Sequence, residues 1–196
     1  MKNNIILTIL LIVIVAIAAI LLWSPETIEQ NSENDIEIQQ AELREGWEVY
    51  KNTEFGFTVH HPAEASIQRE GDIYIKFTYL GAPQAIGEVT DGFTFTVGTH
   101  TSDQTLQQFA ASNYQEQLQA GTPVQAPEQT VLRGNQVYTY RVETLGEVTV
   151  YVVQGSRDNR FHTISYIVAD PNDQGYESVI MDMLRSFQVY EQNSDQ

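Results

Sequence analysis

The histidines are the side chains best suited to acid–base or metal chemistry near neutral pH. The sequence has four of them, His60, His61, His100 and His162. His60 and His61 are neighbours in a predicted strand, so their side chains should point to opposite faces of the sheet. A zinc site needs three or four converging ligands, and the chain has neither an H-x-H nor an H-x-x-x-H pair. We therefore expect surface or strand-end histidines and no metal site.

An acidic segment near the C-terminus has the best spacing for calcium. Residues 170–177 read D-P-N-D-Q-G-Y-E, with glycine at the sixth place as in an EF-hand loop. The twelfth place is Met181, where that loop needs a bidentate glutamate. A turn followed by a helix explains the same residues, with Asp173 as the helix cap. We favour the turn and predict no calcium there.

Motifs for covalent catalysis and for nucleotide binding do not occur in the sequence. Ser156 lies in Q-G-S-R-D, which lacks the second glycine of a G-x-S-x-G nucleophile elbow. The phosphate-binding G-x-x-x-x-G-K and the dinucleotide-binding G-x-G-x-x-G patterns are also missing. We predict no catalytic residue, no cofactor and no enzymatic activity.

Two segments are candidates for contact with a ligand or a partner. Residues 81–92 form a long, mildly apolar loop that includes Ala85, Ile86 and Val89, and long loops on a rigid sheet often carry function. Arg157 and Arg160 flank one predicted turn, where they could hold an anionic ligand or headgroup. The alternative for both arginines is that they are solvated turn charges.

An apolar run near the N-terminus predicts a membrane anchor. Residues from Ile5 to Leu22 include one threonine and no charge, and Trp23 follows at the membrane interface. As a helix, this run would span about 27 Å, close to the thickness of a hydrocarbon core. Lys2 precedes the run, and the next basic residue is Arg44, which places the N-terminus in the cytoplasm and the rest outside.

A cleaved signal peptide is the alternative to an uncleaved anchor. Residues 16–18 read A-I-A, which could serve as a cleavage site. The apolar run, however, exceeds the about 7–15 residues of a usual signal-peptide core. We therefore favour an uncleaved anchor over residues 1–23, and a single-pass protein of the cell membrane.

Composition and charge exclude several classes of protein. The chain has 196 residues, with 26 acidic and 10 basic side chains, a formal net charge of −16 and no cysteine. Such a charge is repelled by phosphate backbones, so we expect no nucleic-acid partner. Without cysteine there is no disulfide, thiolate metal site or lipid-modified thiol. Residues 24–45 hold seven acids and no aromatic residue, which is typical of an extended tether, and we expect disorder also in the tail 191–196.

Residues 46–190 alternate between strand and helix patterns in the manner of one domain. Period-two alternation marks the strands, and apolar spacing at i, i+3, i+4 and i+7 marks two helices. The first helix begins after a cap at Ser102 or Asp103 and stops at Gly121. The predicted strands are 47–50, 55–60, 65–69, 72–80, 93–98, 129–133, 136–144, 148–154 and 161–169, and the last helix is 175–189. Strand hairpins with helices covering the sheet make the fold class α+β.

The order of these elements resembles that of PsbP-like domains. The resemblance lies in F-G-F at residues 55–57 followed by Pro62, and in Thr105-Leu106 at the opening of the middle helix. It continues with Y-T-Y at residues 138–140 and with L-R-S-F at residues 184–187. The resemblance implies an antiparallel β-sheet flanked by helices on both faces, an α/β/α sandwich preceded here by the transmembrane helix.

These features predict a membrane-anchored, extracytoplasmic module that binds a protein or a small ligand without catalysis. One alternative is an accessory subunit of a membrane protein complex, in which the anchor itself makes contacts through Ala16, Ala18 and Ala19. A hydrolytic enzyme without a recognisable motif is the other. The oligomeric state is left open by the sequence.

Overall fold

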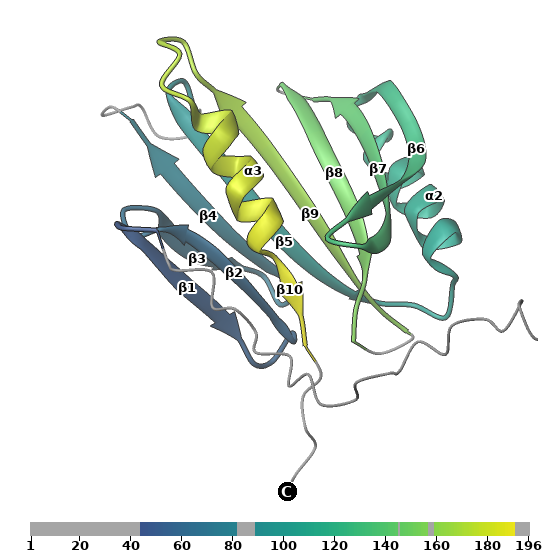
Figure 1. Ribbon diagram of the computed structural model, residues 1–196. Coiled ribbons are helices and arrows are strands. Elements are labelled where there is room, and N and C mark those ends of the chain that lie inside the picture. Colours follow the sequence, from purple (N-terminus) through teal and green to yellow (C-terminus); the bar gives the residue numbers. More distant parts are fainter. Residues whose placement is uncertain (1–43, 82–88, 145, 157–158, 191–196) are drawn as a thin grey trace, which may run out of the picture. The chain divides into compact units, whose positions relative to one another are not determined.

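Strands make up most of the domain, and they pair into two antiparallel sheets. The computed structural model describes residues 44–81, 89–144, 146–156 and 159–190. The smaller sheet has the order β1-β2-β10, and the larger one has the order β3-β4-β5-β9-β8-β7-β6 (Figure 1). The elements are β1 (Trp47–Asn52), β2 (Phe57–Pro62), β3 (Ser66–Glu70), β4 (Tyr74–Leu80), β5 (Gly92–Thr101), α2 (Leu106–Gln117), β6 (Thr122–Leu132), β7 (Asn135–Glu143), β8 (Glu147–Gln154), β9 (Arg160–Ala169), α3 (Tyr176–Ser186) and β10 (Gln188–Val189).

One face of the larger sheet carries the main core. Phe77 of β4 pairs with Phe95 of β5, which in turn pairs with Tyr166 of β9, so these rings point to the same side. Helix α3 lies across β5 and β9 on this side, and the β1–β2 hairpin packs beside it (Figure 1). Ile180 and Met183 of α3 are fully buried there.

The opposite face carries a second core beneath α2. Tyr140, Val150, Val152 and Phe161 point away from α3, because each is one residue out of phase with the side chains of the main core. The Tyr140 hydroxyl donates to Asn113 Oδ1 of α2 at 2.6 Å, and both side chains are buried. The helices therefore cover opposite faces of an antiparallel sheet, which confirms the predicted α+β class.

The boundaries of several elements differ from the prediction, and three of these differences change the interpretation. Helix α2 is capped by Thr105, whose side chain forms a reciprocal capping box with Gln108, rather than by Ser102 or Asp103. Helix α3 ends at Ser186, and residues 188–189 turn back as β10 to pair with β2. Strand β6 begins seven residues earlier than expected, at Thr122, and its register shifts twice, in a segment that contains two prolines.

Several predictions concern residues outside the described ranges. They are the anchor with Ile5, Leu22 and Trp23, most of the tether 24–45, the tail 191–196, and the contact residues Ala85, Ile86 and Arg157. The predicted domain, residues 46–190, lies mostly within the described ranges. Within the described ranges, no helix has the length and apolar character to cross a bilayer.

Candidate aromatic pocket

A pocket of about 400 Å³ opens where four strands and one helix meet. It lies at the start of β1, the end of β2, the end of β4, the start of β5 and the start of α3. This volume is within the range of about 300–1,000 Å³ that is usual for ligand sites. The described residues that line it are Arg44, Glu45, Gly46, Trp47, Pro62, Glu64, Tyr79, Phe93, Gln174, Tyr176 and Val179.

Three aromatic rings form a packed cluster in the wall of this pocket. The rings of Tyr79 and Phe93 stack with centroids 5.5 Å apart and planes 12° apart. Tyr176 leans against both, with centroids 5.6 Å from Tyr79 and 6.4 Å from Phe93. Tyr79 and Phe93 are cross-strand partners, and Tyr176 is the first residue of α3, so rigid elements hold all three rings.

Gly92 allows β4 and β5 to approach each other closely next to these rings. Its φ of +134° is a conformation that favours glycine, and a Cβ there would collide with the carbonyl oxygen of Tyr79. Strand β5 therefore starts directly against the end of β4, and this keeps Tyr79 and Phe93 in register.

The turn before α3 fixes the third ring. The Asp170 carboxylate accepts the backbone N–H groups of Gln174 at 2.6 Å, Gly175 at 2.8 Å and Tyr176 at 3.1 Å. Desolvation acts to raise the pKa of Asp170, but these donors outweigh it and hold that pKa below its ordinary value. The N-cap residue is thus Gly175, not the predicted Asp173, and the Asp170 carboxylate satisfies the N–H groups of the turn and of the first helical residue. Asp173 itself adopts a left-handed conformation, with φ of 54°.

Polar groups surround the mouth of the pocket. The Arg44 guanidinium lies 5.7 Å from the centroid of the Trp47 ring and pairs with Asp182 at 3.4 Å. Glu45 and Glu64 are exposed lining residues. Gln174 Nε2 donates to Asp91 Oδ1 at 2.8 Å. The site therefore joins apolar aromatic walls to a rim that carries two carboxylates and one guanidinium.

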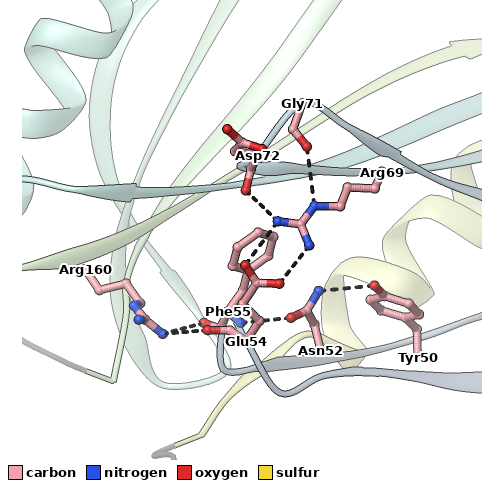
Figure 2. Close-up of polar contacts among 8 residues, drawn as sticks. All are labelled: Tyr50, Asn52, Glu54, Phe55, Arg69, Gly71, Asp72 and Arg160. Carbon is pink, nitrogen blue, oxygen red and sulfur yellow. Dashed lines mark hydrogen bonds and ion pairs between the residues drawn. The ribbon is translucent and has the colours of Figure 1, made fainter.

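Arg160, a predicted anion-binding residue, contacts the protein's own backbone. Figure 2 shows its guanidinium at the turn between β1 and β2, where Nη1 donates to the carbonyl oxygens of Phe55 at 3.0 Å and Glu54 at 3.4 Å. Arg69 holds the same turn through two hydrogen bonds to the Glu54 carboxylate, at 2.7 and 3.0 Å. These bonds keep the pKa of Glu54 below its ordinary value. Binding of an external anion by Arg157 and Arg160 stays a prediction.

The histidines lie in different environments from those expected. His61 and His162 are buried at 3 % and 0 % exposure, so the expectation of a surface position is wrong for both, although each lies near the end of its strand, β2 or β9. His61 and His60 do point to opposite sides of β2, as the strand period predicts. Among the described residues, no three His, Asp or Glu side chains form a group that could hold a metal ion.

The aromatic pocket is the part of the site that sequence reasoning missed. Each of its rings lies in a strand or helix, where packing in the core is the usual expectation. Of the three contact residues predicted in the loop 81–92, Val89 lies within the described ranges and is half-buried. The residues that bound this loop, Tyr79 before it and Phe93 after it, do line the pocket. Aromatic residues at both ends of a long loop are the signal that could have found it.

Comparison with known proteins identifies the fold. No family model matches the sequence, and no curated protein matches it. The solution structure of cyanobacterial PsbP (CyanoP) from Synechocystis sp. PCC 6803 is similar, with a TM-score of 0.50 and 13% identity over 74% of this chain and 93% of that one. The Ran-binding protein Mog1p of Saccharomyces cerevisiae gives a TM-score of 0.47 at 13% identity, over 74% and 96% of the two chains. The first similarity shows that this domain has a PsbP-like fold, which confirms the resemblance in the sequence.

Proposed function

We propose that the chain is a non-catalytic binding module, held at the outer face of a membrane, whose aromatic pocket receives part of a partner molecule. The observation that carries this proposal is the pocket itself. Its rings are held by their packing and by the strand register, so the binding surface exists before a ligand arrives. Such preorganisation lowers the entropic cost of association.

The chemistry of the pocket favours binding over catalysis. The described residues that line it include no histidine, serine, threonine, lysine or cysteine. A serine, threonine, cysteine or lysine nucleophile activated by a histidine is therefore not present among them. Aromatic walls with a polar rim are instead typical of recognition sites.

The apolar run Ile5–Leu22 supports the membrane location. The segment between this run and the pocket residue Arg44 is 21 residues long, from Trp23 to residue 43. Fully extended, it would span at most about 75 Å. A partner bound in the pocket would then be kept within this distance of the bilayer, as suits an accessory module of a membrane-associated protein.

Site-specific photo-crosslinking in cells tests this function. We would place a benzoyl-phenylalanine at Gln174, an exposed residue that lines the pocket, and at Val131, which is 65 % exposed on β6, as a matched control. The expected result is an adduct from position 174 only, which is lost when Trp47→Ala is added. Identical adducts from both positions, or none from position 174, would contradict the proposal.

A further inference from the structure

We propose that the pocket recognises a cationic side chain, an arginine or lysine presented by a basic segment of a partner protein. This inference rests on the proposed binding function and assigns its ligand chemistry. It derives from three features of the site. These are the aromatic walls, the carboxylates at the rim, and the Arg44 guanidinium, which already lies over the Trp47 ring.

The aromatic walls supply the first attraction. Four aromatic side chains, Trp47, Tyr79, Phe93 and Tyr176, line one small volume. Trp47 and Tyr79 are half-buried and supply most of the exposed ring surface, whereas Phe93 and Tyr176 are buried in the core. The faces of such rings carry negative potential, and a guanidinium or ammonium within about 6 Å of a ring centroid is attracted to it. Neutral apolar groups would gain only from the burial of apolar surface.

Arg44 shows that this surface accepts a guanidinium. Its charged group lies 5.7 Å from the Trp47 centroid, within the range of a cation–π contact. Its side chain is 66 % exposed, and its ion pair with Asp182 is a surface pair of the kind that contributes little to stability. Arg44 can therefore leave Trp47 at small cost and give its place to a cation from a partner.

The carboxylates at the rim supply the second attraction. Glu45 and Glu64 line the pocket, and Arg44 is the one cationic group among the described lining residues. The whole chain has a formal net charge of −16, which attracts basic partners at long range. An acidic partner would meet repulsion both at a distance and at the rim.

Trp47 fluorescence provides a direct readout of this pocket. The chain has two tryptophans, so Trp23→Phe leaves Trp47 as the single indole. We would purify this full chain in a maltoside detergent, which carries no cationic headgroup. The probes are the acetylated peptide amides Gly-Gly-Arg-Gly-Gly and Gly-Gly-citrulline-Gly-Gly, which differ in charge while keeping almost the same shape.

The expected result is a saturable change of Trp47 emission with the arginine peptide, and an affinity at least about fivefold weaker for the citrulline peptide. The double variant Glu45→Gln/Glu64→Gln should weaken arginine binding by about fivefold or more and leave citrulline binding unchanged. Arg44→Gln should tighten arginine binding, because it removes the internal competitor. A purely structural role of Arg44 would not produce this gain.

Each of three results with the bound probes would by itself overturn the inference. They are equal affinity for the two peptides, an arginine affinity that is insensitive to both rim glutamates, and binding of tetramethylammonium without binding of the arginine peptide. The last result would assign the pocket to a choline headgroup. If no peptide binds but the crosslink at position 174 still forms in the chain with Trp47 intact, the cationic ligand is also rejected and the binding function stands. Absence of that crosslink from the chain with Trp47 intact would reject both.

Discussion

His162 couples the packing of the main core to pH. Its ring is fully buried, with centroids 5.8 Å from Phe57 and 5.7 Å from Phe187. Its Nδ1 lies 3.1 Å from Thr99 Oγ1, while Nε2 has no hydrogen-bond partner among the described residues. A second proton on the ring would therefore place a positive charge in the core, where Nε2 has no partner to compensate it, which is costly. The neutral ring acts as part of the core.

This environment predicts a loss of stability in mild acid. Burial, and then the positive charges of Arg160 and His100, lower the pKa of His162 from 6.5 to about 4. The unfolded chain gains a proton as the pH falls through 6.5, whereas the folded protein resists until about pH 4, so stability is lost across this window. The full difference corresponds to about 3 kcal/mol.

Urea unfolding at pH 7.5 and pH 5.0 measures this effect. The free energy of unfolding should fall by about 2 kcal/mol between the two conditions on account of His162. His162→Gln should reduce the pH dependence without removing it, because the pKa values of His60 and His100 are also lowered, chiefly by burial. An unchanged pH dependence in this variant would show that His162 is not the group responsible.

At the scale of elements, local patterns predict the strands well and the ends of helices poorly. Strands such as β5 and β9 follow period-two alternation, which a sequence displays directly. The caps depend on backbone geometry: Asp170 reaches forward to three N–H groups at the start of α3, a contact that the chain makes only once the turn is formed. Strand β10 depends on β2, more than 100 residues earlier, so no local signal separates it from the preceding helix.

The contact between α2 and the sheet predicts a measurable contribution to stability. Tyr140→Phe removes the hydroxyl that donates to Asn113 and leaves a buried amide oxygen without that donor. The expected loss is about 1–3 kcal/mol in the free energy of unfolding. Tyr138→Phe, on the same strand and half-buried, is the matched control and should cost less than about 0.5 kcal/mol. Equal losses would show that the hydrogen bond does not hold α2.

The junction between β4 and β5 predicts a strong dependence of stability on a single glycine. Gly92→Ala introduces a collision with the Tyr79 carbonyl oxygen as well as an unfavourable φ. Gly134→Ala is the matched control, since Gly134 also has a positive φ, of +81°, but open space around its Cβ position. We expect about 1–2 kcal/mol of destabilisation for Gly134→Ala and at least about 1 kcal/mol more for Gly92→Ala. Equal values from denaturant unfolding would mean that the strand ends separate to relieve the collision.

At the scale of the whole molecule, the pocket is a feature that a single sequence does not predict. Its aromatic residues range from Trp47 to Tyr176, and they meet only because five elements end at one place. Composition and periodicity describe each element by itself, so they assign these rings to the core. The length of the loop 81–92 predicts a contact surface there, and the strand ends on either side of this loop do line the pocket.

The N-terminal apolar run predicts that the chain is anchored in a membrane, and this prediction can be tested by substitution. A charged residue at the centre of a membrane helix costs about 2.5–3.5 kcal/mol on insertion scales. Val13→Arg combined with Val15→Arg should therefore release the chain from membranes, whereas Val13→Leu with Val15→Leu should not.

Alkaline carbonate extraction followed by mass measurement distinguishes an uncleaved anchor from a cleaved signal peptide. An uncleaved anchor keeps the full chain, 22.2 kDa, in the carbonate-resistant fraction. Cleavage after the A-I-A sequence at residues 16–18 would instead give a shorter, extractable product and would show that the domain is released rather than anchored.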